Sequence, residues 1–340
     1  MKNKTIIIAE AGVNHNGDID LAKKLIDAAV SAGVDYVKFQ TFKAEKLVTP
    51  TSKKAKYQQE NTGNQSQTQF EMLKKLELDL DTHKELIDYC SQVGIKFLST
   101  AFDLDSVDIL EDLGADLFKI PSGEMTNLPY LEKIAGIGKP VILSTGMCTL
   151  GDVEDAFNVF TNAGLSKTKI SILHCNTEYP TPMADVNLNA MNTLGTAFDV
   201  AYGYSDHTLG IEVPIAAVAK GATIIEKHFT LDKNMEGPDH KASLDPEELY
   251  SMVRAIRNIE IALGSMVKAP STSESKNIIV ARKSIHIVRE VSKGEKIELD
   301  DLIMVRPGDG ISPMEVKAII GKSLRHDLPS GSQLKYSDFE

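Results

Sequence analysis

Polar side chains stand at the end of each of eight short, β-branched segments of this chain. In chain order they are Glu10, Lys38 with Gln40, Ser99 with Thr100, Lys119 before Ser122 and Glu124, Ser144, His174 before Tyr179, Ser205 with His207, and Glu226 with His228. Carboxylates, ammonium groups, hydroxyls and imidazoles together can bind anions and metal ions and move protons. Because the pattern repeats eight times, we interpret these residues as one functional site rather than as scattered surface groups.

His207 and His228 end the last two of these segments. A single histidine at a strand end is usually a hydrogen-bonded structural residue, but two on neighbouring strands can converge on one divalent cation and leave positions open for substrate. Glu226 lies two residues before His228 and therefore points to the same side of its strand. It is predicted to be either a third ligand or a group that orients a ligand.

Lys38 and Lys119 lie in otherwise apolar segments, where an unpaired ammonium group is costly. One interpretation is structural, with Lys38 paired to Glu10 and Lys119 paired to Glu124. Another is a phosphate cradle in which the two lysines act with the hydroxyls and glycine turns at 122–124 and 144–146. A third is a Schiff-base lysine, which the histidine pair disfavours.

The elements that must position these residues alternate in type. The eight β-branched runs are residues 5–10, 35–40, 96–101, 116–121, 140–145, 169–175, 199–207 and 223–228. Amphipathic segments between them carry helix signals, for example from Asp18 to Gly33, Asp81 to Gly94 and Asp103 to Gly114, and from Asp245 onward. Apolar strands alternating with helices predict a parallel sheet, and eight units predict an α/β fold of the (β/α)8 TIM-barrel type. An open doubly wound sheet is the alternative, but the glycine fingerprint that would follow its first strand is missing.

The composition changes after the eighth unit. We predict a catalytic barrel over 1–265, a linker over 266–281 rich in Ser and Lys, and a small β-rich domain over 282–340. About 60 residues is near the lower limit for independent folding, so this domain is expected to lean on the barrel or on a partner subunit. The loop 41–69 is long enough for a substrate lid, with a disordered insert as the alternative.

Charge and composition exclude several classes of protein. The 340 residues contain 37 Lys and Arg against 48 Asp and Glu, a formal net charge of −11, so the clustered basic face of a nucleic-acid binder is not expected. The apolar run near the N-terminus is too short for a signal peptide or a membrane span, which predicts a cytoplasmic protein with no membrane partner. Cys90, Cys148 and Cys175 are widely spaced in apolar stretches and are predicted to be buried free thiols.

Longer motifs in the same order carry a family resemblance. They are Ile8-Ala-Glu10-Ala-Gly-Val-Asn14-His15-Asn16-Gly17, Val37-Lys38-Phe-Gln-Thr-Phe, Phe118-Lys119-Ile-Pro-Ser122-Gly-Glu124, Leu143-Ser144-Thr-Gly-Met147, His174-Cys-Asn-Thr-Glu-Tyr179-Pro-Thr-Pro182, Ser205-Asp-His207-Thr, Glu226-Lys-His228-Phe-Thr and Gly237-Pro-Asp239-His240. Together they resemble bacterial sialic acid synthases over essentially the whole chain. The tail with Arg306-Pro-Gly-Asp-Gly310 resembles the antifreeze-like (SAF-type) domain that ends these enzymes.

The resemblance implies a reaction and a partner for each part of the site. The family condenses phosphoenolpyruvate with an N-acylated mannosamine-type sugar (an N-acyl hexosamine) and water, giving a nine-carbon 2-keto acid and phosphate. It implies that His207 and His228 hold Mn2+, with Mg2+ or Co2+ as alternatives, and that Glu124 handles a proton, with Glu10 and Lys119 as further catalytic residues. By the same resemblance, the remaining roles are Glu10 and Asp239 on the sugar or metal-bound water, Lys38, Lys119, Ser122 and Ser144 on phosphoenolpyruvate, and Tyr179, Thr100 and Ser205 lining the site.

The resemblance also implies an assembly and leaves the sugar open. A homodimer is expected in which the C-terminal domain of one chain serves the barrel of the other, with Arg306 reaching an acyl group of the sugar. The product is N-acetylneuraminate or N,N'-diacetyllegionaminate, which the motifs do not separate. Two other functions remain to be distinguished: a metal-dependent pyruvate aldolase and a non-catalytic carbohydrate-binding scaffold.

Overall fold

The computed structural model describes residues 4–62 and 66–340. The chain divides into two compact units, Met1–Gly264 and Ser265–Glu340, each with its own core. The first unit holds the predicted strands and their polar ends. The segment predicted as a linker contains a helix, α12 (Thr272–Ala281), whose first turn is closed by a capping box between Ser271 and Glu274.

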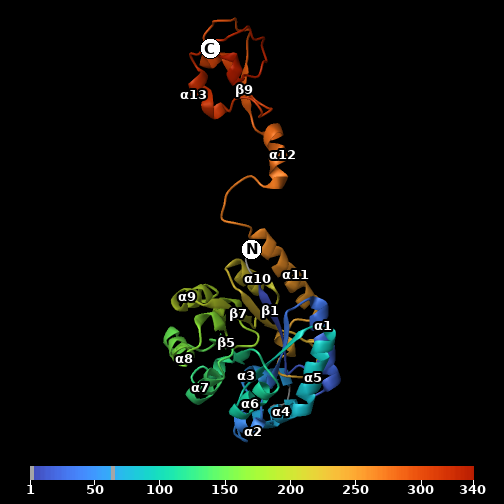
Figure 1. The fold of residues 1–340 in the computed structure, drawn as a ribbon. Helices are drawn as coiled ribbons and strands as arrows, with labels where there is room; N and C mark the ends of the chain where they lie inside the picture. The colour runs from blue at the N-terminus through green and yellow to red at the C-terminus, as the bar shows by residue number, and fades with distance from the viewer. Residues whose placement is uncertain (1–3, 63–65) are drawn as a thin grey trace. The chain divides into compact units, whose positions relative to one another are not determined.

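The first unit confirms the predicted barrel. Among the described residues, eight parallel strands close into a ring in chain order, surrounded by helices (Figure 1). They are β1 (Ile6–Gly12), β2 (Tyr36–Thr41), β3 (Lys96–Ala101), β4 (Phe118–Ile120), β5 (Val141–Ser144), β6 (Ile170–Cys175), β7 (Ala201–Asp206) and β8 (Ile224–His228). The predicted alternative, an open doubly wound sheet, is therefore wrong, because β1 pairs with both β2 and β8.

Helices connect the strands and cover the outside of the barrel. They are α1 (Ile19–Ala32), α2 (Ala44–Leu47), α3 (Lys56–Thr62), α4 (Gln69–Leu76), α5 (Leu80–Val93), α6 (Leu104–Asp112), α7 (Leu128–Ile137), α8 (Leu150–Asn162), α9 (Asn189–Phe198), α10 (Glu212–Ala219) and α11 (Pro246–Ala262). Local chemistry sets several ends: the Asp18 and Asp245 side chains accept hydrogen bonds from first-turn amides, and Gly33 ends α1 in the left-handed region at φ 76°.

An aliphatic layer fills the barrel interior below the polar strand ends. It consists of Ile8, Leu98, Ile142, Leu173 and Ile224, all buried. Four of these residues stand two positions before a polar residue of the same strand, and Leu173 stands two positions before Cys175, so both side chains of each pair point into the barrel. The polar groups therefore rest on an apolar floor, where charges are poorly screened and must be paired.

The segment predicted as the loop 41–69 is instead largely folded. Its described part contains α2, α3 and the start of α4, and a small core holds it against the barrel: Val13, Phe42, Ala44, Met72, Leu73 and Leu76. Lys74 bridges Glu45 (2.7 Å) and Glu77 (3.1 Å), which ties α2 to α4. We call residues 42–78 the β2–α5 insert; residues 63–65 lie outside the described part.

The second unit is small and rich in turns. β9 (Ser284–Ile287) and β10 (Leu302–Val305) pair antiparallel, and α13 (Val316–Ile319) follows. Its core is aliphatic with one aromatic ring: Ile285, Ile287, Val291, Ile297, Ile311, Ile319, Leu324, Leu328, Leu334 and Phe339. In neither described stretch of the chain is a helix both long and apolar enough to span a bilayer.

A buried ion pair joins β7 and β8 on the outer face of the barrel. Lys227 Nζ lies 2.5 Å from Asp206 Oδ2 and donates to the carbonyl of Thr208, and both charged side chains are completely buried. Asp206 directly precedes His207, and Lys227 directly precedes His228. Because side chains alternate along a strand, pinning these two outward groups together fixes the two histidines on the inner side.

We expect Lys227→Met to lower the free energy of unfolding by about 3–5 kcal/mol, because it leaves the Asp206 carboxylate buried without its cation. Lys4→Met is the matched control: it removes an exposed ion pair with Asp35, worth about 0–1 kcal/mol. Denaturant unfolding followed by circular dichroism measures both. Equal, small losses would show that the buried pair is dispensable.

Candidate active site

A polar cavity of about 170 Å³ opens where the barrel strands end. Ten of the predicted site residues line it: Glu10, Lys38, Thr100, Lys119, Ser122, Ser144, Tyr179, Ser205, His207 and His228. They come from strands and strand ends all around the barrel, as expected for this fold. Glu124, Asp239 and Arg306 are placed elsewhere and are described below.

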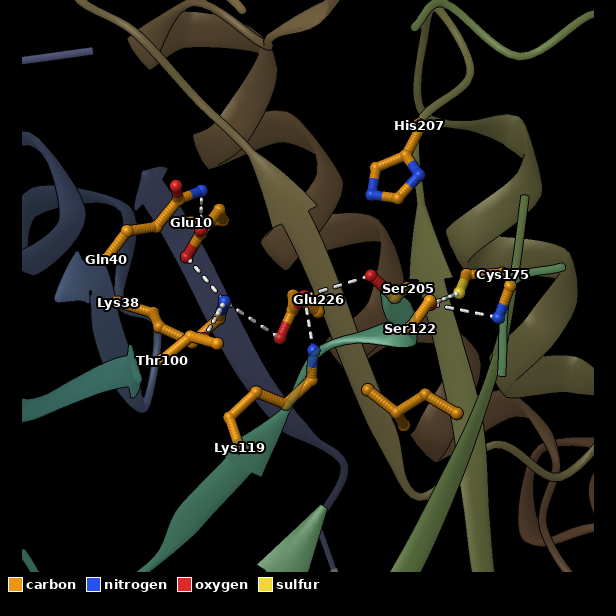
Figure 2. Close-up of polar contacts among 12 residues, drawn as sticks. Glu10, Lys38, Gln40, Thr100, Lys119, Ser122, Cys175, Ser205, His207 and Glu226 are labelled. Atoms are coloured by element: carbon orange, nitrogen blue, oxygen red, sulfur yellow. Dashed lines mark hydrogen bonds and ion pairs between the residues drawn. The ribbon is translucent and has the colours of Figure 1, made fainter. Parts of the chain in front are cut away.

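Two carboxylates hold the Lys38 side chain on the face of β2 that points into the barrel. Its Nζ lies 2.9 Å from Glu10 Oε2 and 3.6 Å from Glu226 Oε2, and it donates to Thr100 Oγ1 at 3.0 Å (Figure 2). The strand register explains the first contact, since Glu10 is aligned with Lys38 on β2 and with His228 on β8. The predicted Lys38–Glu10 pair is therefore present.

Glu226 is the centre of the network. Its Oε1 accepts from Lys119 Nζ at 3.2 Å and from Ser205 Oγ at 2.9 Å, so this carboxylate lies between the two lysines (Figure 2). The alternative pairing of Lys119 with Glu124 is thus not formed. In this structure Glu226 contacts both lysines and Ser205, and its role as a third ligand or an orienting group stays a prediction.

The charges of this network are set by burial and by each other. Burial raises the pKa of Glu226, but the adjacent Lys119 and Lys38 outweigh it and hold that pKa at about 2. Burial raises the pKa of Glu10, with Lys38 opposing it. Burial, reinforced by Lys38, lowers the pKa of Lys119. The site thus combines a firmly ionised carboxylate with one that protonates more readily, and an incoming anion meets two ammonium groups.

Hydroxyl and backbone groups form a second part of the cavity. Ser122 Oγ accepts from the backbone N–H of Gly146 at 2.9 Å and lies 3.2 Å from Cys175 Sγ. Within the described parts of the chain, the buried Ser144 Oγ has no hydrogen-bond partner. A buried hydroxyl of this kind is expected to donate to a bound ligand. With Lys119 nearby, these groups suit a phosphate or a carboxylate.

His207 and His228 face the same cavity across 5.4 Å between ring centroids, and Tyr179 packs on His207 at 4.0 Å. His207 Nδ1 donates to the carbonyl of Asn176 (2.5 Å), which leaves Nε2 available. The buried Nδ1 of His228 has no partner among the residues described. Burial lowers the pKa of both rings, of His207 to about 4, so both are neutral, the form that binds metals.

This pair fits a divalent cation that takes its remaining ligands from substrate and water. Within residues 4–62 and 66–340 no group of three or more His, Cys, Asp or Glu side chains is arranged to hold a metal ion.

Three predicted residues stand outside this cavity. Glu124 ends a short 3-10 turn (Ser122–Glu124), and its carboxylate accepts from Asn127 Nδ2 at 2.5 Å. Asp239 lines an adjoining cavity, and burial together with Glu10 raises its pKa to about 7. Arg306 belongs to the second unit, where its Nε donates to the carbonyl of Ala281 at 3.1 Å.

Sequence reasoning missed two contributors. Cys175 was predicted only as a buried thiol, yet it lines the cavity. Its position two residues after the inward-facing Leu173 is the signal that would have placed it there. Tyr57 of the β2–α5 insert stacks on Tyr179 with ring centroids 5.2 Å apart. This contact joins segments 122 residues apart and left no local pattern in the sequence.

A family comparison agrees with this geometry. The model of the NeuB family matches residues 25–268, and that of the SAF domain matches residues 282–340. The chain belongs to the NeuB family. This confirms the resemblance on which the site residues were named, and it covers both units of the chain.

Similar proteins span nearly the full length. The chain is 54% identical to the N,N'-diacetyllegionaminic acid synthase of Campylobacter jejuni, covering 94% of this chain and 95% of that one. It is 49% identical to the enzyme of the same name from Legionella pneumophila, covering 98% and 94%. Among solved structures, the N-acetylneuraminic acid (sialic acid) synthetase of Leptospira borgpetersenii, in complex with citrate, matches with a TM-score of 0.71 at 34% identity, covering 81% and 90%.

Gly146 supports a direct test of the anion pocket in this NeuB-family chain. A Cβ there would lie 2.6 Å from Thr177 Cγ2 and 2.9 Å from Ser122 Oγ, whereas a Cβ at the exposed Gly136 of α7 meets nothing within 4 Å. We expect Gly146→Ala to weaken the binding of inorganic phosphate by roughly tenfold or more, the scale of one hydrogen bond to a charged group. Gly136→Ala is the control outside the cavity, and calorimetric titration measures both. Equal affinities would contradict an anion site at Ser122.

Proposed function

We propose that this chain is a nonulosonic acid synthase that condenses phosphoenolpyruvate with an N-acylated mannosamine-type sugar and water, releasing phosphate and a nine-carbon 2-keto acid. The observation that carries the proposal is the polar cavity itself. Two buried lysines and the hydroxyl of Ser144, which has no hydrogen-bond partner among the described residues, lie there beside two neutral histidines. The first group suits an anionic enol phosphate and the second suits an electrophile held by a metal. The full-length similarity to two N,N'-diacetyllegionaminic acid synthases supports the same reaction class.

Binding of phosphoenolpyruvate is assigned to Lys38, Lys119, Ser122 and Ser144. Its carboxylate and phosphate bring negative charge into a cavity that already contains Glu10 and Glu226. Lys38 and Lys119 offset that charge, and the aliphatic floor below them keeps the interaction poorly screened. Glu226 holds both ammonium groups in place before the substrate arrives.

Bond making requires two proton transfers, one to the aldehyde oxygen of the sugar and one from the attacking water. The C–C bond forms between C3 of phosphoenolpyruvate and the aldehyde carbon of the sugar, water adds at C2, and the C–O bond to phosphate breaks. Glu10 lies in the cavity lining, whereas Glu124 is bonded to Asn127 at the end of its turn. Glu124 stays a proposed proton handler, and Glu10 is proposed as a second one because it lines the cavity.

A divalent metal is proposed at His207 and His228, with Mn2+ preferred. When bound, such an ion supplies Lewis-acid polarisation of the sugar aldehyde. The contribution of the chain is to hold both imidazoles neutral and facing one another. Asn176 orients His207 through its backbone carbonyl, and the Asp206–Lys227 pair holds the strand ends.

The sugar that the comparisons favour is 2,4-diacetamido-2,4,6-trideoxymannose, giving N,N'-diacetyllegionaminate. Identity to the two synthases of that acid is 54% and 49%, against 34% to the N-acetylneuraminate-9-phosphate synthases of mouse and human. We therefore propose the legionaminate branch over N-acetylneuraminate.

One assay separates this proposal from its alternatives. We expect phosphate release from phosphoenolpyruvate with 2,4-diacetamido-2,4,6-trideoxymannose, a slower rate with N-acetylmannosamine and none without sugar. A pyruvate aldolase would consume free pyruvate and release no phosphate, and a carbohydrate-binding scaffold would release none with any sugar.

Glu10→Gln should lower kcat by roughly 10² or more in the same assay, the usual scale for a positioned acid or base.

The same assay tests the metal. Chelation should abolish turnover, and added Mn2+ should restore it. Calorimetric titration of Mn2+ into the resting protein gives an independent readout, in which His228→Ala should bind the ion far more weakly than the wild type. Full turnover in the chelated protein would overturn the metal assignment.

We also propose a homodimer in which the SAF domain of one chain serves the barrel of its partner through Arg306. The match of residues 282–340 to the SAF domain supports this, as does the exposed position of Arg306.

Mixing Arg306→Ala with His228→Ala tests the exchange. In a swapped heterodimer one of the two sites receives an intact barrel and an intact arginine, so random pairing should restore about a quarter of wild-type activity. If the arginine served its own barrel, every site would carry one lesion. Heterodimers confirmed by mass but lacking activity would therefore contradict the swap.

A further inference from the structure

A second cavity adjoins the polar one and differs from it in chemistry. It measures about 280 Å³ and shares four lining residues with the polar cavity: Gln40, Phe102, Tyr179 and His228. The two spaces therefore meet beside the histidine pair. Beyond that junction, the β2–α5 insert supplies most of the wall.

The wall that the insert contributes is largely aliphatic. Leu47 and Val48 come from the end of α2, and Met72, Leu73 and Leu76 come from α4. These side chains belong to the small core that holds the insert against the barrel, so their positions are fixed by packing. Polar groups also line the cavity: Asp239 and Gln40 from outside the insert, and Tyr57, Gln58 and Gln69 from the insert itself.

The insert is anchored on both sides of this cavity. Asn61 Nδ2 donates to the carbonyl of Pro238 at 2.6 Å, next to Asp239, and Tyr57 stacks on Tyr179. The aliphatic wall is therefore tied to the loop that carries Asp239 and to the tyrosine at the junction. A ligand in the second cavity would contact a preformed surface.

The proposed function sets where a sugar would lie. Its aldehyde carbon would lie at the junction of the two cavities, beside the histidine pair, because the new bond forms to that carbon. A sugar that extends away from phosphoenolpyruvate would then enter the second cavity, and its C5–C6 end would meet the aliphatic side chains of the insert.

We propose that the β2–α5 insert forms a specificity subsite for a 6-deoxy sugar, in which Val48 and Met72 contact the C6 methyl group. A methyl group loses little by leaving water and gains contacts with these side chains. A C6 hydroxyl held against Val48 and Met72 would face carbon on that side and lose the hydrogen bonds that water makes to it there. An apolar pocket rejects an added hydroxyl by roughly 10- to 100-fold in kcat/KM.

The test uses two substrates that differ by one hydroxyl. They are 2-acetamido-2,6-dideoxymannose and N-acetylmannosamine, assayed by phosphate release from phosphoenolpyruvate. The wild type is expected to prefer the 6-deoxy sugar by about tenfold or more in kcat/KM. A wild type that prefers the 6-hydroxy sugar, or uses both equally, overturns the proposal.

Two variants then assign the preference to the insert. Val48→Thr keeps the shape of a half-buried side chain and adds a hydroxyl, and Met72→Gln places an amide on the same wall. Both variants should lower the ratio of kcat/KM for the 6-deoxy sugar to kcat/KM for N-acetylmannosamine at least fivefold. Val30→Thr makes the same chemical change on the partly exposed face of α1 and should leave the ratio as in the wild type.

The outcomes distinguish a failure of the proposed synthase activity from a failure of the proposed subsite. Absence of phosphate release with every sugar would contradict the proposed synthase activity itself. Phosphate release with an unchanged ratio in both variants would leave that activity intact and overturn the subsite. Because a ratio is compared within one protein sample, partial loss of folded enzyme in Met72→Gln does not alter it, and Val48→Thr provides an independent measurement.

Discussion

The site depends on one buried electrostatic arrangement, in which Glu226 lies between Lys38 and Lys119 above an aliphatic layer. Removing two ammonium groups from water is costly, and this carboxylate, with Glu10, repays the cost only at short distances. The barrel register supplies those distances. The same apolar floor that makes the ions costly also strengthens their interaction with a bound anion.

A separate ion pair on the outside of the barrel positions the two histidines of the site. Asp206 and Lys227 precede the two histidines, and their completely buried contact ties β7 to β8. The inner network prepares the anion pocket, and the outer pair holds the imidazoles. Burial then keeps both rings neutral, which suits metal binding and leaves the positive charge of the cavity to the lysines.

The β2–α5 insert adds a different chemistry to a common barrel. It lines the second cavity, which adjoins the polar one, with several aliphatic side chains. The insert is held by its own small core, by Asn61 and by Tyr57. In a barrel enzyme the strand ends supply reactivity and the connecting segments supply selectivity. The division between the two cavities follows that rule.

The sequence by itself determined the barrel and most of the cavity, because the strand period is a local signal that recurs eight times and capping residues mark several of the helices between the strands. Residues such as Lys38, Ser144 and His228 follow from that period, since a strand end faces inward at every second position. Only the tertiary structure decided that Lys119 pairs with Glu226 rather than Glu124, that Tyr57 stacks on Tyr179, and that the described part of the 41–69 segment folds. These depend on contacts between residues distant in sequence, and their energies are set by burial that no local pattern records.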